Sequence, residues 1–211
     1  MSMFTMRHVL LLAAAALTTT ACSSDRTHFY TLLKPDTAAP AIAGGAAFAI
    51  NVQSLRVPAQ VDQPELVVRQ GEGELALVET RQWIAPLKDE MRGALSAELS
   101  TRLHTHDVAG LAMPDGLPVY RVLVDVQRLD SWLAHSVSLD AVWTVVGPAV
   151  GTGSAPSWTC ASHVSEPVNA GYEPLVIGAQ QALARVAADI ASTIEVAQRG
   201  ATDAVACPAT N

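Results

Sequence analysis

Apolar and polar residues alternate in most segments of the chain, but in two longer segments the apolar residues recur at every third or fourth position. Alternation is typical of half-buried strands, and spacing of three and four is typical of amphipathic helices. The predicted order is therefore four strands, a helix, three strands and a final helix. The predicted strands are 28–33, 48–57, 65–69, 74–78, 120–129, 133–146 and 157–165.

The two helical segments have clear apolar stripes. The first follows Pro86, a residue tolerated at a first helical position, and repeats apolar residues at four-residue steps from Leu87 to Leu103. The second begins near Pro174, and its stripe continues to Ile194. Hairpin strands combined with two amphipathic helices predict an α+β fold, in which one mainly antiparallel mixed sheet carries both helices on one face.

Turn residues and tryptophans refine this prediction. Gly71 and Gly73 suit a hairpin turn with positive φ between the third and fourth strands. Trp143 is in phase with the apolar face of its strand, which predicts core packing rather than a lipid groove. Trp132 lies at a hairpin end, where an indole is suited to contact a neighbouring protein or a membrane.

The N-terminal segment 1–21 has the pattern of an export signal. Arg7 supplies a positive charge, an unbroken apolar run covers 9–17, and small residues follow up to Ala21. The apolar run is much shorter than the roughly 20 residues that a membrane-spanning helix needs. Cleavage after Ala21 would make Cys22 the first residue of the mature chain.

This arrangement resembles the lipobox of bacterial lipoproteins, in which the sulfur of the terminal cysteine is acylated. An ordinary secretory cleavage site is the alternative, because Thr19 stands where a lipobox usually has leucine. The chain holds three cysteines, and an odd number in an exported protein leaves one thiol without a partner in the same chain. Lipidation of Cys22 resolves this. Ser23, rather than an aspartate, follows the cysteine and predicts sorting to the outer membrane with the body facing the periplasm.

The remaining cysteines, Cys160 and Cys207, are then free to pair in an oxidising compartment. The predicted disulfide would tie the C-terminal tail to the last strand. Two unpaired thiols are the alternative. The predicted organisation is a signal peptide (1–21), a lipidated tether (22–27), one α+β domain (28–199) and a tail (200–211).

Composition excludes several classes of function. The chain has a net charge of −7, and removal of the signal peptide takes away one basic residue and no acidic one. An acidic body does not favour nucleic acid, whose binding depends on clustered Lys and Arg. Half of the residues are hydrophobic, so the mature chain can bury a core. No nucleophile elbow, phosphate loop or dinucleotide fingerprint is present, so the sequence predicts neither catalysis nor a cofactor.

Two short motifs have competing interpretations. His104 and His106 could be a metal pair, but the other ligands of a zinc site are not apparent and exposed histidines at a helix end are commoner. We therefore predict no metal. Asp62 and Pro64, in the segment Asp62-Gln63-Pro64, could contact a partner protein, although an aspartate that forms a turn is an equal alternative.

Several segments, taken together and in order, resemble the ABC-type transport auxiliary lipoproteins. They cover nearly the whole mature chain. The matching segments are Phe29-Tyr30-Thr31-Leu32, Val57-Pro58, Asp62-Gln63-Pro64-Glu65-Leu66-Val67-Val68-Arg69, Trp83, Ala85-Pro86-Leu87, Tyr120-Arg121-Val122, Asp125-Val126-Gln127-Arg128, Leu139-Asp140-Ala141-Val142-Trp143 and Gly171-Tyr172.

The resemblance implies a periplasm-facing lipoprotein that works with an MCE-domain membrane protein and an ABC-type machine in lipid transport between membranes. It brings no catalytic residues. It also implies a homo-oligomer at the outer-membrane end of the conduit, contributing to envelope integrity. A stand-alone lipid-binding or structural envelope lipoprotein is the alternative.

Overall fold

A computed structural model of the chain describes residues 25–35, 47–53, 55–112, 116–149, 153–200 and Cys207. The predicted order of elements is confirmed. In chain order the elements are β1 (His28–Tyr30), β2 (Ala49–Val52), β3 (Glu65–Arg69), β4 (Leu75–Trp83), α2 (Leu87–Leu103), β5 (Val119–Trp132), β6 (Ser136–Val146), β7 (Ser157–Pro167) and α3 (Tyr172–Gln198).

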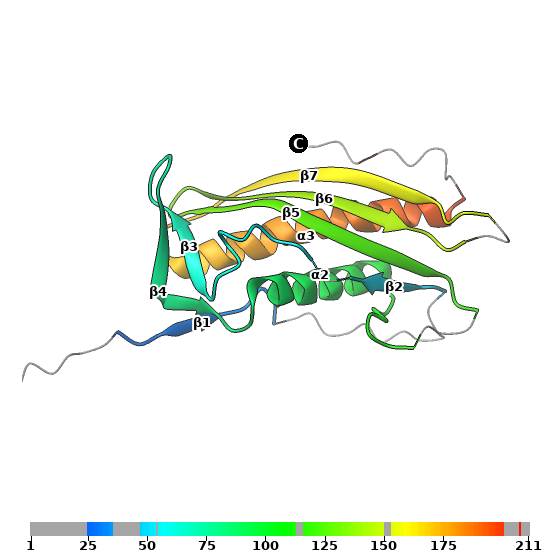
Figure 1. The fold of residues 1–211 in the computed structure, drawn as a ribbon, viewed down its shortest axis with the longest axis horizontal. Helices are drawn as coiled ribbons and strands as arrows, with labels where there is room; N and C mark the ends of the chain where they lie inside the picture. The colour runs from blue at the N-terminus through cyan, green and yellow to red at the C-terminus, as the bar shows by residue number, and fades with distance from the viewer. Residues whose placement is uncertain are drawn as a thin grey trace, which may run out of the picture.

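The strands form one mixed seven-stranded sheet in the order β1-β4-β3-β5-β6-β7, with β2 paired to the first half of β5. The pairs β3–β4, β5–β6 and β6–β7 are antiparallel. The pairs β1–β4 and β2–β5 are parallel, and β3 meets β5 where Arg69 lies opposite Trp132. As Figure 1 shows, β1, β3 and β4 form one end of an elongated molecule, and β2 lies toward the other end.

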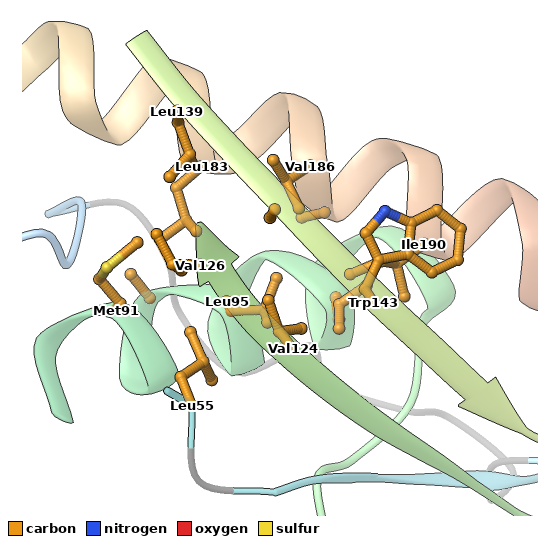
Figure 2. Close-up of a cluster of buried hydrophobic side chains, with 14 of the residues drawn as sticks. Leu55, Met91, Leu95, Val124, Val126, Leu139, Trp143, Leu183, Val186 and Ile190 are labelled. Carbon is orange, nitrogen blue, oxygen red and sulfur yellow. The ribbon is translucent and has the colours of Figure 1, made fainter. Parts of the chain in front are cut away.

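Both helices cover the same face of the sheet, as the α+β prediction requires. Figure 2 shows Met91 and Leu95 of α2, Leu183 and Ile190 of α3 and inward side chains of β5 and β6 as parts of one buried cluster. Alternation along β5 and β6 sends every second residue into this layer. The indole of Trp143 is only 1% exposed, so the predicted core role of this tryptophan is confirmed.

Several strand boundaries differ from the prediction. The first strand ends at Tyr30 rather than at residue 33, because Thr31 and Leu32 leave the sheet to bind a helix side chain. The second covers only Ala49–Val52, and the chain beyond it keeps isolated bonds to β5. The fourth is longer than predicted and continues to Trp83, where it acquires β1 as a partner.

The β5–β6 turn also differs from the prediction. β5 continues to Trp132, and β6 begins at Ser136, not at residue 133. Ala134 adopts a left-handed conformation with φ of 58°, which the tight turn imposes although alanine disfavours it. Gly71 and Gly73 are not among the residues with positive φ, so the predicted glycine-dependent hairpin turn is wrong in its backbone conformation.

No helix in the described part of the chain is long and apolar enough to cross a membrane. The predicted signal peptide (1–21) and the predicted lipidation site Cys22 lie outside the described residues. The first described residues lead directly into β1, so the structure does place the point at which a tether would join the body.

Candidate docking site

A groove lies where the end of β4 meets the start of α2. Its volume is about 440 Å³, and apolar side chains contribute most of its surface. Two segments separated by about twenty residues in the sequence form its walls. The lining residues are Asp62, Gln63, Pro64, Trp83, Ile84, Ala85, Pro86 and Lys88.

Backbone hydrogen bonds fix the two walls to each other. The Trp83 N–H donates to the Pro64 carbonyl at 2.8 Å, which joins the end of β4 to the segment before β3. Pro86 occupies the N-cap of α2, and its carbonyl accepts the N–H groups of Asp89 and Glu90. The groove is therefore bounded by a strand end and a helix start, both of which are rigid elements.

The interpretations of Asp62 as a turn residue and as a contact residue are compatible in the structure. Its N–H donates to the Pro58 carbonyl at 3.1 Å, so Asp62 closes a turn. Its side chain also lines the groove, together with Pro64. The structure therefore brings these two predicted contact residues together.

Trp132, the third predicted contact residue, lies outside the groove. It is opposite Arg69 at the far end of β3, whereas Pro64 precedes the first residue of that strand. Its indole is 37% exposed and packs against the imidazole of His135, with 4.7 Å between ring centroids. A contact made by Trp132 would thus be separate from a contact made in the groove.

The N-terminal strand lies directly beside the groove. Tyr30 of β1 is in register with Trp83, and the Ile84 N–H donates to the Tyr30 carbonyl at 2.9 Å. Figure 1 shows the chain reaching β1 from the end of the molecule that carries β4. The groove therefore lies next to the first strand of the described chain.

A buried carboxylate secures this N-terminal segment. Glu90 of α2 is 5% exposed, and it accepts hydrogen bonds from the Thr31 hydroxyl at 2.7 Å and the Leu32 N–H at 2.8 Å. From α3, the Gln180 amide donates to the Thr31 carbonyl at 3.0 Å. Hydrogen bonds to a charged acceptor are stronger than neutral ones. The segment after β1 is therefore held by both helices.

Sequence reasoning missed the role of Glu90, although a signal was present. Glu90 is three residues after Leu87 and four before Ala94, and both of those residues belong to the apolar stripe of α2. An acidic side chain on the buried face of a helix needs a partner. The partner segment, Thr31 and Leu32, could not be identified from the spacing alone.

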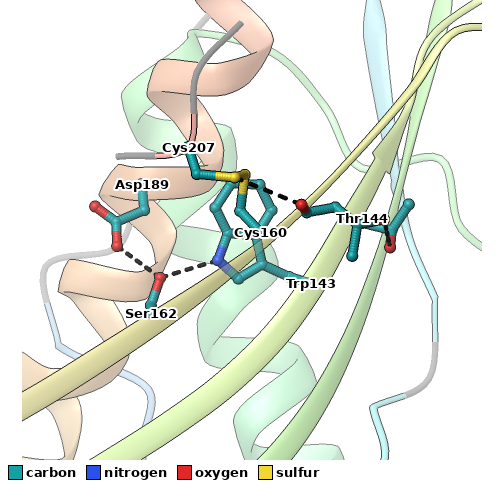
Figure 3. Close-up of a disulfide and its surroundings, with 7 residues drawn as sticks. Trp143, Thr144, Cys160, Ser162, Asp189 and Cys207 are labelled. Atoms are coloured by element: carbon teal, nitrogen blue, oxygen red, sulfur yellow. Dashed lines mark hydrogen bonds between the residues drawn. A yellow bond between two sulfur atoms is a disulfide. The ribbon is translucent and has the colours of Figure 1, made fainter. Parts of the chain in front are cut away.

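The opposite half of the molecule holds the C-terminal disulfide. Cys160 of β7 and Cys207 are joined, with 5.4 Å between their Cα atoms. Cys160 is also in register with Trp143 on β6. As Figure 3 shows, the Trp143 indole donates to the Ser162 hydroxyl at 2.9 Å, and that hydroxyl donates to Asp189 of α3 at 2.6 Å. This polar chain was not predicted.

Asp140 at the centre of β6 has a nitrogen-bearing side chain on either side. Arg128 of β5 contacts its carboxylate at 2.7 Å, and Nδ1 of His163 on β7 lies 3.2 Å from it. Partial burial acts to raise the pKa of Asp140, but the hydrogen bonds from Arg128 and His163 outweigh burial and hold this pKa below its ordinary value. These contacts connect the adjacent strands β5, β6 and β7.

The described residues offer nothing that resembles a metal centre. Among them, no three His, Cys, Asp or Glu side chains lie close enough to hold an ion. His104 caps the C-terminal end of α2 in a left-handed conformation. The groove itself presents apolar surface with one carboxylate and one ammonium group, which suits binding by contact.

Comparisons with known proteins agree with this architecture. One solved structure, of an uncharacterised protein, aligns with a TM-score of 0.60 at 19% identity and covers 81% of this chain and 99% of its own. Another, of a Xanthomonas campestris protein described under the family DUF330, aligns with a TM-score of 0.56 at 18% identity and covers 82% of this chain and 99% of its own. At these identities the likeness shows the fold alone.

No curated protein matches the chain significantly. A family model described as the ABC-type transport auxiliary lipoprotein component matches residues 30–191, from the last residue of β1 to most of α3. The matched region includes every lining residue of the groove, and also Glu90. The chain belongs to the ABC-type transport auxiliary lipoprotein family.

Proposed function

We propose that this protein is a non-enzymatic, periplasm-facing lipoprotein of an MCE/ABC-type system that transports lipid between membranes. In this proposal the acylated Cys22 anchors it in the outer membrane, and the groove beside β1 docks the MCE-domain partner. The observation that carries the proposal is the position of the groove. It lies beside the strand that leads back to Cys22, and it is lined by the two segments Asp62-Gln63-Pro64 and Ala85-Pro86.

Chain length supports this arrangement. Cys22 precedes His28, the first residue of β1, by six residues. Six extended residues span at most about 20 Å. A partner in the groove would therefore be held near the surface of the anchoring membrane. Tethering also raises the effective concentration of the docking partner. Delivery of lipid to that membrane would contribute to envelope integrity.

A second contact surface suits association between copies. Trp132 and Leu75 lie on either side of Arg69 in the sheet, and Leu77 of β4 is exposed nearby. Apolar side chains that share one sheet face commonly mark an interaction surface. We propose that this surface contributes to a homo-oligomer, separately from the groove.

Site-specific crosslinking in cells tests the docking. A photoreactive amino acid in place of Gln63, in the groove, should capture the MCE-domain protein, whereas the same replacement of the exposed Leu111 should not. Capture at both positions, or at neither, would contradict docking in the groove.

A charge reversal provides a quantitative version of the test. Lys88→Glu changes the one ammonium group of the groove, and Arg121→Glu changes an exposed cation on β5 outside it. We expect the first variant to reduce co-purification of the partner by about tenfold, within the range for loss of an interface charge, and the second to leave it unchanged. Equal retention in both would reject the groove as the docking site.

The apolar lining of the groove also favours a second candidate, in which the protein binds lipid by itself. Grooves of this volume are within the usual range for small-molecule sites. Two results together would favour this alternative: about one lipid molecule extracted per purified monomer, and unchanged envelope function in cells that lack the transporter. Turnover of an ester or glycan substrate would overturn the non-enzymatic assignment.

A further inference from the structure

We propose that Phe29 and Ile84 form a lipid-contacting edge that enters the headgroup region of the membrane holding Cys22. This inference rests on the anchorage proposed above and adds a fixed orientation of the body on the bilayer. The ligand is the bilayer surface itself, recognised through apolar contact.

Both side chains are unusually exposed for their type. Phe29 is 58% exposed and Ile84 is 62% exposed. Phe29 is in β1, and Ile84 directly follows the paired strand β4: Phe29 lies opposite Gln82, and the carbonyl of Tyr30 accepts the Ile84 N–H. Together these exposed apolar side chains form a small apolar edge, which adjoins the groove because Ile84 also lines it.

The position of this edge singles out a membrane as its occupant. Phe29 is seven residues after Cys22, so an extended tether brings it within about 25 Å of the acylated residue at most. The Glu90 and Gln180 bonds fix the segment after β1 to both helices, so β1 is part of the body that the tether joins. A short tether that joins a clamped strand presents one defined end of the molecule to the bilayer.

Charge at this end is compatible with lipid headgroups. Arg26, two residues before β1, and Lys88, at the groove, are both exposed. Apolar side chains flanked by cations are typical of surfaces that lie in the membrane interface. Asp25 and Asp89, each next to one of these cations, are exposed as well, so apolar contact rather than net positive charge carries the proposal.

The far end of the molecule supplies a matched control. Leu111 is 68% exposed, more than either edge residue. It follows Val108, whose N–H donates to Ile50 of β2, and Figure 1 places β2 away from β1. Exposure alone therefore predicts that Leu111 would contact lipid at least as well, whereas orientation by the tether predicts that it would not.

The test uses the mature chain, residues 22–211, coupled through the Cys22 thiol to a maleimide phospholipid in vesicles of phosphatidylethanolamine and phosphatidylglycerol. This coupling makes the test independent of acylation in cells. A photoreactive phenylalanine derivative replaces Phe29, Ile84 or Leu111 in separate samples, and lipid adducts are counted by mass spectrometry. We expect at least about five times as much lipid adduct at positions 29 and 84 as at position 111. An interfacial surface enters the bilayer only about 5–10 Å deep, so a residue at the opposite end of the molecule stays out of the lipid.

Equal adduct at all three positions, or adduct at none, would overturn the proposal. A second measurement controls for misfolding and uses the Phe29→Ser/Ile84→Ser double variant, which changes only exposed positions. Its thermal unfolding temperature should equal that of the wild type, but on vesicles its β1–β4 end should be cut faster by protease. If adducts fail to form while Gln63 still captures the partner in cells, the membrane orientation is wrong and the docking function stands.

Discussion

The two ends of the molecule are built on different principles. At the far end, Trp143 is buried, its indole bonds to Ser162, and a disulfide joins β7 to Cys207. At the end that carries β1 and β4, here called the tether end, a groove is open, the exposed apolar side chains include Phe29 and Ile84, and one buried carboxylate, Glu90, holds the N-terminal segment. The far end is held by a buried indole and a covalent link, although Leu111 is exposed there, whereas the tether end combines a groove with exposed apolar side chains.

This difference suggests how stability and function are divided. Burial of apolar surface is the main favourable term in folding, so Phe29 and Ile84, which stay exposed, contribute little to the free energy of unfolding. The far end and the helix–sheet core supply stability without them. The tether end can therefore carry contact residues whose replacement leaves folding largely unaffected. Variants at matched positions in the two ends test this division.

The largest contrast is expected between two tryptophans. Trp143→Ala removes a fully buried indole and leaves the Ser162 hydroxyl without its donor, so we expect a loss of about 3–5 kcal/mol in the free energy of unfolding. Trp132→Ala removes an indole on the surface and should change it by less than about 1 kcal/mol. Chemical denaturation of both variants measures the difference. Similar losses would show that the two ends are equally important for stability.

Removing the disulfide should lower the stability of the fold without changing the groove. The bridge spans 47 residues. Replacing both cysteines, as Cys160→Ala with Cys207→Ala, should cost about 2–4 kcal/mol by the loop-entropy argument. Thermal unfolding in the absence of reductant checks this value. Partner capture at Gln63 should persist at a temperature where the variant is still folded. Two free thiols in the native protein, found by non-reducing mass spectrometry, would remove the premise.

Two helical glycines should respond to alanine in opposite directions. A Cβ at Gly178 of α3 would lie 2.4 Å from a methyl carbon of Val168, so Gly178→Ala forces repacking against β6 and should cost about 1–3 kcal/mol. A Cβ at Gly93 of α2 meets nothing within 4 Å. Gly93→Ala should therefore stabilise the protein by up to about 1 kcal/mol. Destabilisation by Gly93→Ala would contradict the open space at Gly93, and an unchanged stability of Gly178→Ala would contradict the close packing of α3 against Val168.

At the tether end, the carboxylate of Glu90 can be tested against a partly exposed neighbour. Glu90→Gln keeps the shape but loses the charge that accepts the Thr31 and Leu32 bonds, and should cost about 1–2 kcal/mol. Glu98→Gln, which affects ion pairs at the surface with Lys34 and Arg102, should cost less than about 1 kcal/mol. Limited proteolysis should cut near residue 31 faster in the first variant only.

The smallest effect concerns pH. The pKa of Asp140 is held below its ordinary value by Arg128 and His163, so the ionised carboxylate stabilises the folded state. That stability is present above roughly pH 4 and is lost as the pH falls through the lowered pKa. Asp140→Asn should therefore differ from the wild type by less than about 1 kcal/mol at neutral pH, because the side chains of its partners, Arg128 and His163, are more than half exposed. The difference should shrink in acid; a constant difference down to pH 2 would contradict this assignment.

The elements were predictable because each carries a clear period. The spacing from Leu87 to Leu103 and the alternation through β5 and β6 are strong local signals, and they yielded the order of elements and the core position of Trp143. The ends of strands were less predictable, because they depend on tertiary partners. β1 stops at Tyr30 only because Glu90 captures the next two residues.

The groove was predictable only in part. Asp62 and Pro64 were identified as contact residues, and the structure places both in its lining. Ile84 and Lys88 also line the groove, because β4 continues to Trp83 and is followed almost directly by α2. No local sequence pattern indicated this connection. Trp132 was grouped with Asp62 and Pro64, but β3 separates it from them.

The central claim is that this protein acts from a bilayer to which its mature N-terminus is covalently attached. Intact-mass spectrometry of the native protein, purified from membranes in detergent, tests that claim most directly. We predict a chain that starts at Cys22 and carries the added mass of its acyl chains, and that becomes soluble when Cys22→Ser is introduced. A freely soluble native product that starts at Cys22 with an unmodified thiol would contradict the account.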